Sequence, residues 1–292
     1  MRANGAPRRL PWPRAMPIIR AMQGIEGYLY DDEADLLLAL TVWTVTRFRR
    51  PYAVVELGSY CGKSTVVFGM AAKAVRPGVR VYAIDPHEGE LSVADQVVQS
   101  EPTFARFLRN MESVGVADVV VPIRARSTAV KWTRPIGLLF IDALHDYESV
   151  SSDFRHFAPW VVPRGYIAFH DYGKSDFPGV TRFVDEVVGD GGFRPVDRVA
   201  GLIVLEKVSR RGNSVDAPFA SRRVVAPGRL RPERTSPGRG RTTPRIEGGD
   251  PGANAICIES GPEVCLADEI QELRGAHQRS RGEVESRWNK RS

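Results

Sequence analysis

Short apolar runs alternate with longer amphipathic segments along the first two thirds of the chain. The apolar runs have the length of strands, and the segments between or after them have the length of helices. Strands are predicted at 53–57, 80–84, 119–124, 137–141 and 166–170, and helices near 64–74, 103–114, 147–160 and 180–188. Strands that alternate with helices form a parallel sheet covered on both faces. The pattern therefore predicts an α/β domain.

Two further patterns flank this alternation. Upstream, the acidic residues 31–33 precede a broadly apolar stretch, which indicates a helix with an acidic first turn. Downstream, the runs 193–199 and 202–206 are separated by an Ala-Gly pair, which predicts a terminal hairpin. After Lys207 no second domain is evident, although 267–275 has the pattern of a short helix.

The segment Tyr52–Thr65, YAVVELGSYCGKST, is the most informative part of the chain. An apolar strand run breaks at Gly58 and Gly62 and continues as a helix. Because glycines carry no side chain, a strand, glycine turn and helix N-terminus present backbone N–H groups and unshielded backbone to a ligand. The segment is interpreted as a cofactor loop, with Glu56, Gly58, Ser59 and Gly62 as its contacts.

The spacing of the glycines argues against two common cofactor loops. A phosphate-binding P-loop has four residues between its first Gly and the Gly-Lys-Ser, and here three residues intervene. The dinucleotide fingerprint is Gly-x-Gly-x-x-Gly, whereas this loop is Gly-x-x-x-Gly. Both matches are poor.

Residues 56–64, ELGSYCGKS, instead resemble the first motif of class I S-adenosylmethionine-dependent methyltransferases. The likeness is greatest to the O-methyltransferase branch that contains the catechol and macrolide-sugar O-methyltransferases. It covers residues 25–207, with 1–24 as an N-terminal extension. It implies a Rossmann-like, doubly wound and mostly parallel seven-stranded sheet of order 3-2-1-4-5-7-6 with a terminal antiparallel hairpin. S-adenosylmethionine is the cofactor that the resemblance implies.

An acid also ends the second predicted strand, in the run VYAID that closes on Asp85. A carboxylate there can accept hydrogen bonds from both hydroxyls of a ribose, and a turn cap is the alternative role. The resemblance further implies an adenine contact at Ser127. That serine is also a candidate N-cap for the segment after it.

Two later strands end in acids, at Asp142 in LLFIDALHDY and at Asp171 in IAFHDY. Neighbouring strands lie about 4.8 Å apart, so the two carboxylates can converge. In the resembling metal-dependent enzymes, acids at these strand ends hold Mg²⁺, which lowers the pKa of the acceptor hydroxyl. Catechol-type enzymes have Asn after the second acid, whereas this chain has Tyr172. Metal dependence and turn capping by the two acids both stay open, and His145 is the preferred general base, with a structural role as its alternative.

Composition places the charge outside the predicted domain. The formal net charge is +6, but residues 208–245 hold ten Lys or Arg against two Asp or Glu. This Pro/Gly/Arg-rich tail, from 208 to 292, is expected to be largely disordered, as a solvated linker or a weak polyanion-binding segment. No specific nucleic-acid binding is expected. Three cysteines without metal-type spacing, no run long enough to span a membrane and no secretion signal favour the cytoplasm. Met16 is a second candidate start.

These features predict an enzyme that transfers a methyl group from S-adenosylmethionine to a hydroxyl of a small molecule, such as a sugar or a secondary metabolite. The sulfonium already makes the methyl group electrophilic, so the protein mainly aligns the oxygen and removes its proton. A P-loop-like nucleotide hydrolase and a cofactor-binding scaffold without catalysis are the alternatives. The sequence leaves a homo-oligomer open.

Overall fold

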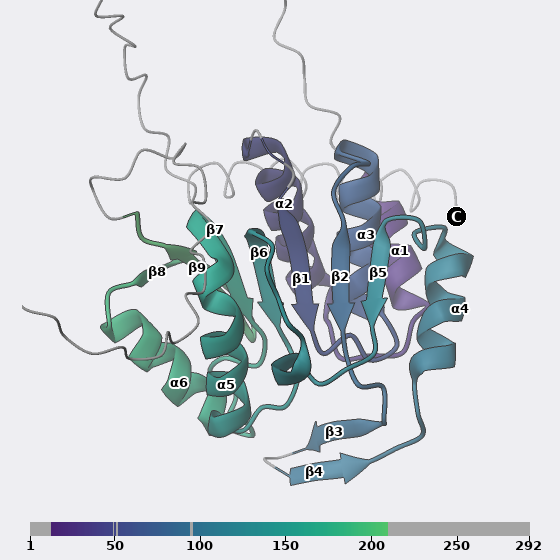
Figure 1. The fold of residues 1–292 in the computed structure, drawn as a ribbon. Helices are drawn as coiled ribbons and strands as arrows, with labels where there is room; N and C mark the ends of the chain where they lie inside the picture. The colour runs from purple at the N-terminus through teal and green to yellow at the C-terminus, as the bar shows by residue number, and fades with distance from the viewer. Residues whose placement is uncertain (1–12, 49, 51, 94–95, 210–292) are drawn as a thin grey trace, which may run out of the picture. The chain divides into compact units, whose positions relative to one another are not determined.

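The computed structural model describes residues 13–209, except 49, 51, 94 and 95. The predicted tail therefore lies, from residue 210 on, outside the described residues. Figure 1 shows the alternation of strands and helices. The strands are β1 (Ala53–Leu57), β2 (Val81–Ile84), β3 (Glu90–Val93), β4 (Gln96–Gln99), β5 (Val120–Ile123), β6 (Ile136–Ile141), β7 (Val161–Phe169), β8 (Phe193–Val199) and β9 (Leu202–Lys207). The helices are α1 (Ala15–Gln23), α2 (Asp31–Arg47), α3 (Lys63–Val75), α4 (Phe104–Val114), α5 (Tyr147–Phe157) and α6 (Pro178–Gly189), with short 3₁₀ helices η1 (Ser127–Ala129) and η2 (Ala158–Trp160).

Seven strands form one sheet in the order β5-β2-β1-β6-β7-β9-β8. The first five of that order run parallel, and β9 is antiparallel to both β7 and β8. Numbered along the chain without β3 and β4, the order is 3-2-1-4-5-7-6. The predicted sheet and its terminal hairpin are thus confirmed. Because five neighbouring strands are parallel, their carboxyl ends meet at one edge, which lies at the bottom of Figure 1.

Helices cover both faces of this sheet. The buried side chains of α1 to α4 form one core with one face, and those of α5 and α6 form a second core with the other (Figure 1). Along β1, Val54 belongs to the first core, whereas Val55 and Leu57 belong to the second, because successive strand side chains point to opposite faces. Each such buried side chain contributes about 1.5–3 kcal/mol. The central strands are therefore firmly fixed.

Helix α1 extends the folded unit beyond the start expected at Ile25. Its Ile18, Ile19 and Met22 are buried and join the first core, so part of the predicted N-terminal extension belongs to the domain. A nine-residue helix is marginal on its own and depends on packing.

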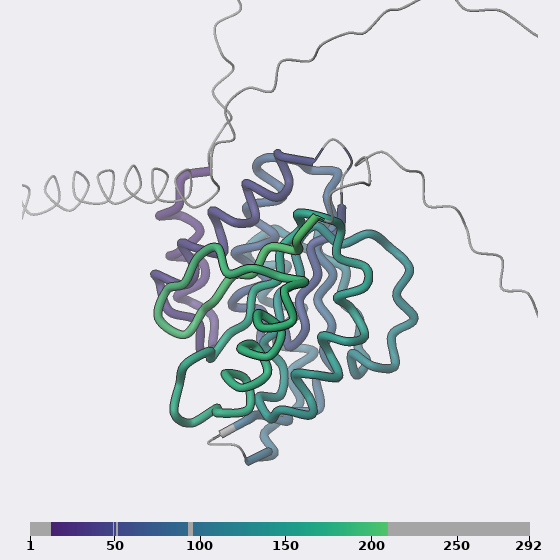
Figure 2. Tube along the Cα trace, turned by 90° about the vertical axis from the view of Figure 1, so that its left-hand side faces the viewer, coloured from purple at the N-terminus to yellow at the C-terminus, as the bar shows by residue number. Residues whose placement is uncertain are grey.

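The hairpin of β3 and β4 was not predicted. Its strands pair antiparallel, from Glu90 with Gln99 to Val93 with Gln96. Both views place it beyond the carboxyl edge of the sheet (Figures 1 and 2). All four residues of β4 are exposed, and the adjacent Val97 and Val98 break the apolar alternation that marks a half-buried strand. Within the described part of the chain, no helix is both long and apolar enough to cross a membrane.

Candidate active site

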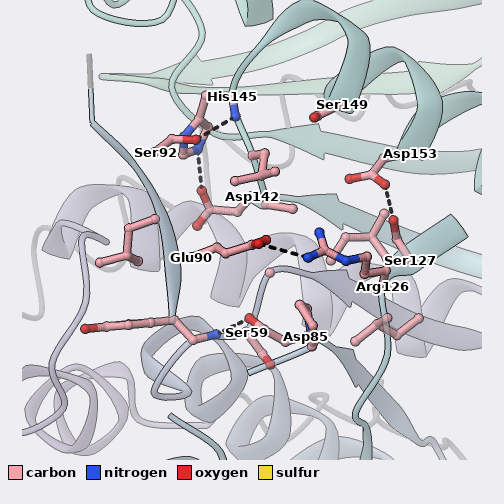
Figure 3. Close-up of a pocket in the computed structure, with 18 of the residues that line it drawn as sticks. Ser59, Asp85, Glu90, Ser92, Arg126, Ser127, Asp142, His145, Ser149 and Asp153 are labelled. Atoms are coloured by element: carbon pink, nitrogen blue, oxygen red, sulfur yellow. Dashed lines mark hydrogen bonds and ion pairs between the residues drawn. The ribbon is translucent and has the colours of Figure 1, made fainter. Parts of the chain in front are cut away.

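A cavity of about 400 Å³ lies at the carboxyl edge of the sheet. Its wall comes from the loops after β1, β2, β5 and β6, from β3, and from the segment before α2 (Figure 3). Open α/β sheets bind ligands at this edge, and the volume suits a small organic molecule. Six of the nine predicted site residues line the cavity, namely Gly58, Ser59, Asp85, Ser127, Asp142 and His145. The other three are Glu56, Gly62 and Asp171.

Gly58 allows the loops after β1 and β6 to touch. Its φ is +86°, and a Cβ on it would lie 2.1 Å from the carbonyl oxygen of Asp142. No real Cβ approaches another atom so closely, so any side chain at position 58 would force the two loops apart. From the sequence, the space left by the absent side chain was expected to hold the cofactor. The structure shows that the backbone of Asp142 occupies the space first.

Gly62, the residue before α3, faces α4 and is not part of the cavity wall. Its φ is +92°, and a Cβ would lie 2.4 Å from Cε of Met111 and 3.2 Å from Cδ2 of Phe107. The second glycine therefore allows α4 to pack on the loop. Its contact with a cofactor stays a prediction.

Glu56 is fully buried beneath the loop and is likewise outside the cavity wall. The hydroxyls of Ser64 and Thr65, in the first turn of α3, donate hydrogen bonds to its two carboxylate oxygens, the second at 2.5 Å. Burial raises the pKa of Glu56 to about 8, although these two hydrogen bonds act in the opposite direction. Glu56 thus ties β1 to α3, and its contact with a cofactor stays a prediction.

Ser59 has the environment expected of a ligand contact. Its side chain is buried, it lines the cavity, and its hydroxyl has no hydrogen-bond partner among the described residues. A buried hydroxyl without a partner costs about 1–3 kcal/mol. A polar group of a bound molecule would remove that cost.

Asp85 has the capping role that was the alternative for its position, and its contact with a ribose stays a prediction. One carboxylate oxygen accepts the backbone N–H of Tyr60 at 2.8 Å, and the other accepts that of His87 at 2.6 Å. The carboxylate therefore joins the loops after β1 and β2. Because a carboxylate offers about four acceptor positions, Asp85 still has capacity for the hydroxyls of a ligand in the cavity.

Ser127 does not act as an N-cap. It is the first residue of η1, and its hydroxyl donates a hydrogen bond to the Asp153 carboxylate of α5 (Figure 3). Asp153 is buried, and this burial raises its pKa to about 6. Both residues line the cavity, so the pair forms a polar wall at its β5 end.

Asp142, His145 and Asp171 come together where β6 and β7 end. The Nε2 atom of His145 lies 3.4 Å from Oδ1 of Asp142 and 3.1 Å from Oδ2 of Asp171. The backbone N–H of His145 donates to Ser92 of β3 at 3.1 Å, so the hairpin reaches the cluster (Figure 3). Two carboxylates on one side of the imidazole favour a proton on Nε2. Nδ1 of His145 is buried and has no partner among the described residues.

His170 lies between three carboxylates. Its Nδ1 is 3.1 Å from Oδ1 of Asp142, and its Nε2 is 3.0 Å from Oε2 of Glu33 in the first turn of α2. Burial alone would lower the pKa of His170, but the charge of Asp142 and hydrogen bonds to Asp142, Asp171 and Glu33 raise it well above its ordinary value. Burial likewise favours the neutral forms of Asp142 and Asp171, but the neighbouring imidazoles lower the pKa of both carboxyl groups below the ordinary value. Lys174 lowers the pKa of Asp171 further. The carboxylates around His170 thus favour its protonated form.

The residues present fit Mg²⁺ poorly. Among the described residues, one group has three potential ligand atoms within 4.8 Å of one another, formed by Asp142, His170 and Asp171. Mg²⁺ prefers a shell of about six oxygens, whereas this group has one imidazole. Its carboxylates also face nitrogen donors, including Lys174 Nζ at 2.5 Å from Asp171. The convergence of the two acids does not by itself make a magnesium site.

Sequence reasoning did not select several of these residues. Glu33 is one of three acids at a helix start, where acids commonly interact with the helix dipole, and nothing in the sequence links it to His170. Arg126, which lines the cavity and pairs with Glu88 and Glu90, depends on a hairpin that the pattern did not show. Lys174 has no motif signal.

The chain is similar to known proteins over the region that forms this site. Residues 55–172 match the family model described as a methyltransferase domain. An uncharacterized protein of Sinorhizobium fredii, y4gI, is 26% identical over 137 residues, which is 44% of this chain and 14% of that protein. This chain thus spans a small part of the length of its curated relative.

Two solved structures are similar in fold. The O-methyltransferase NovP is 18% identical, with a TM-score of 0.51 over 60% of this chain and 80% of NovP. The O-methyltransferase TomG of Streptomyces achromogenes, solved with S-adenosylmethionine, is 16% identical, with a TM-score of 0.47 over 68% and 90% of the two chains. At 18% identity the likeness to NovP is one of fold alone. Residues 55–172 thus match a methyltransferase domain, and the sheet order is that of the class I methyltransferase fold.

Proposed function

We propose that this domain methylates a hydroxyl oxygen of a small molecule, with His145 as the general base. The observation that carries the proposal is the placement of His145 and Asp142 on the wall of the same cavity as Ser59 and Asp85. The proposed base and the proposed cofactor contacts thus line one cavity. Sugars and secondary metabolites are the acceptor classes that the sequence resemblance favours.

The sheet order supports one direction for the cofactor along the cavity. Asp85 follows β2, which lies between β5 on one side and β1 and β6 on the other. If Asp85 holds the ribose of S-adenosylmethionine, the adenine would lie at the Ser127–Asp153 wall. The amino-acid part would then lie on the Ser59 side. The reacting end then lies toward β6, where His145 is found. When bound, S-adenosylmethionine supplies an electrophilic methyl group on its sulfonium sulfur.

The contacts of His145 favour the tautomer that a general base requires. Asp142 and Asp171 lie at Nε2 and fix a proton there, so Nδ1 carries the lone pair that can accept a proton. The ring is held against Phe177, with 4.5 Å between the ring centroids. In the proposed reaction, Nδ1 of His145 would accept the proton of the acceptor hydroxyl. Bound S-adenosylmethionine would supply the methyl group and, with its carbon–sulfur bond broken, leave as S-adenosylhomocysteine. The two carboxylates stabilise the resulting imidazolium.

Binding and turnover test separate parts of this proposal. Calorimetry should show that the full chain binds S-adenosylhomocysteine and does not bind ATP, since the loop lacks P-loop spacing. Incubation with S-adenosylmethionine carrying a labelled methyl group and a panel of hydroxylated sugars and aromatic alcohols should give an O-methylated product, identified by mass spectrometry. Tight binding with no product from any acceptor would support the scaffold alternative, and binding of ATP alone would overturn the cofactor assignment.

A further inference from the structure

Side-chain nitrogen atoms already contact the acid pair, Asp142 and Asp171, at the ends of β6 and β7. Oδ1 of Asp171 lies 2.5 Å from Nζ of Lys174, and its Oδ2 lies 3.1 Å from Nε2 of His145. Oδ1 of Asp142 lies 3.1 Å from Nδ1 of His170 and 3.4 Å from Nε2 of His145. A divalent cation shared by the two carboxylates would have to displace these contacts.

We propose that Asp142 and Asp171 act without a divalent cation, and that the Lys174 ammonium takes that cation's place as a fixed positive charge at Asp171. The inference rests on the proposed function, because it concerns the acids beside the proposed base. Lys174 is then a positioning residue, since it contacts Asp171, which in turn contacts His145.

Three separate segments hold Lys174 in place. Its Nζ lies 5.6 Å from the centroid of the Tyr30 ring, in the segment before α2. Its stem lies against the turn between β8 and β9, where a Cβ on Gly201 would be only 2.7 Å from Cε of Lys174. Its backbone N–H donates to the carbonyl of Asp171. The side chain is 34% exposed, so the ammonium is not simply a solvated surface charge.

Charge and ligand chemistry both disfavour a divalent cation at this point. The Lys174 ammonium forms an ion pair with Oδ1 of Asp171 that lacks hydrogen-bond geometry. Its charge repels a second cation on the same carboxylate, and the repulsion is stronger at a partly buried site than in water. The third potential ligand, His170, supplies nitrogen, whereas Mg²⁺ prefers oxygen. Elsewhere in the described residues no comparable group of ligands could serve as an alternative site.

Metal content and metal binding test the proposal on the full chain. We expect elemental analysis of the purified protein to find no stoichiometric Mg, Mn or Zn. Calorimetric titration with MgCl₂ should show no saturable binding at millimolar concentration, with or without S-adenosylhomocysteine. Methyl transfer should be unaffected by EDTA. Stoichiometric metal, or an EDTA-sensitive Mg²⁺ signal in the titration, would overturn the proposal.

Substitution of Lys174 and His170 together gives a gain-of-function test. The double variant Lys174→Met with His170→Asp removes the ammonium and replaces the imidazole by a third carboxylate, so MgCl₂ affinity should rise at least about tenfold over the wild type. Lys73→Met is the matched control, because it removes an ammonium that pairs with Asp118 at 2.6 Å, away from the site. It should bind no Mg²⁺. A double variant that binds S-adenosylhomocysteine but gains no Mg²⁺ affinity would contradict the proposal.

A single substitution tests the positioning role of Lys174. Lys174→Met should lower turnover while leaving S-adenosylhomocysteine affinity within about twofold, and Lys174→Arg, which keeps the charge, should restore most of the turnover. Equal turnover in the Met and Arg variants would show that the charge has no role. If the wild type does not bind S-adenosylhomocysteine, the proposed function is refuted. The metal titrations need no cofactor, so they still test the metal proposal separately.

Discussion

The carboxylate of Asp85 at the end of β2 accepts the backbone N–H of Tyr60 in the loop after β1, at a distance of 2.8 Å. Its other oxygen accepts the backbone N–H of His87. The residue proposed to bind the ribose therefore also fixes the shape of the loop on which the rest of the cofactor would lie. Substitution of Asp85 would disturb the loop as well as the proposed ribose contact, and an experiment must separate the two effects.

We predict that Asp85→Ala weakens binding of S-adenosylhomocysteine by more than the direct contact alone. Loss of hydrogen bonds to a charged group costs about 1.5–3 kcal/mol, or roughly ten- to 150-fold in affinity, and the loosened loop adds to this. Calorimetry with a 2′,3′-dideoxy analogue isolates the ribose contact, because the analogue lacks both hydroxyls. The variant should lose less affinity for the analogue than for the natural ligand. Equal losses would leave Asp85 with the loop role alone.

Gly58→Ala should lower the free energy of unfolding, and not only weaken cofactor binding. The new Cβ would lie 2.1 Å from the Asp142 carbonyl, and φ is +86°. Gly115 is the matched control, because its φ is +75° but no atom would lie within 4 Å of its Cβ. Denaturant unfolding should show a loss of about 1 kcal/mol for Gly115→Ala, from backbone strain, and several kcal/mol for Gly58→Ala. Similar losses in the two variants would refute the close contact between the loops.

The parallel sheet and the edge that holds the site were predictable because they follow from short-range rules. Alternating strands and helices give a parallel sheet, and parallel strands end at one edge. The sequence therefore placed Asp85, Asp142 and Asp171 at that edge. The resemblance supplied the strand order, which local pattern alone does not determine.

Long-range contacts were not predictable from the sequence. Glu33 and His170 are 137 positions apart, and each has an ordinary local explanation. A glycine can leave room for a ligand or for another part of the same chain, and the sequence does not distinguish the two. Gly58 was expected to leave room for a ligand, but it leaves room for the backbone of Asp142. The β3–β4 hairpin buries too little apolar surface to leave a pattern. These features depend on which segments meet.

We expect His145→Ala to lower turnover by about 10²- to 10⁴-fold while the affinity for S-adenosylhomocysteine stays within about twofold. The reason is that His145 supplies the proton acceptor and no hydrogen bond to the proposed cofactor-binding loops. His156→Ala is the control: its Nε2 contacts the Val130 carbonyl at 2.7 Å, away from the acid pair. Single-turnover rates with a labelled methyl donor measure the effect. Comparable rates for the wild type and the His145 variant would mean that another group removes the proton.

Glu56→Gln should change how stability depends on pH. The pKa of Glu56 is about 8 in the folded protein against an ordinary value of 4.5, so between these values the folded state keeps a proton that the unfolded state has lost. Because the unfolded state then binds fewer protons, the free energy of unfolding falls as pH rises through this window. Below about 4.5 both states are protonated and the full stability is present.

The glutamine variant cannot ionise, so it lacks this loss. Its free energy of unfolding relative to the wild type should therefore rise between about pH 4.5 and 8 and level off above, with a total change of up to a few kcal/mol at about 1.4 kcal/mol per unit of pKa difference. Any change in the hydrogen bonds from Ser64 and Thr65 adds a constant offset that does not vary with pH. Urea unfolding at half-unit pH steps gives the curve, with the exposed Glu101→Gln as the control for a glutamate elsewhere. A flat difference across the window would show that Glu56 is ionised in the folded protein, and the hydroxyls of α3 would then be holding a buried negative charge.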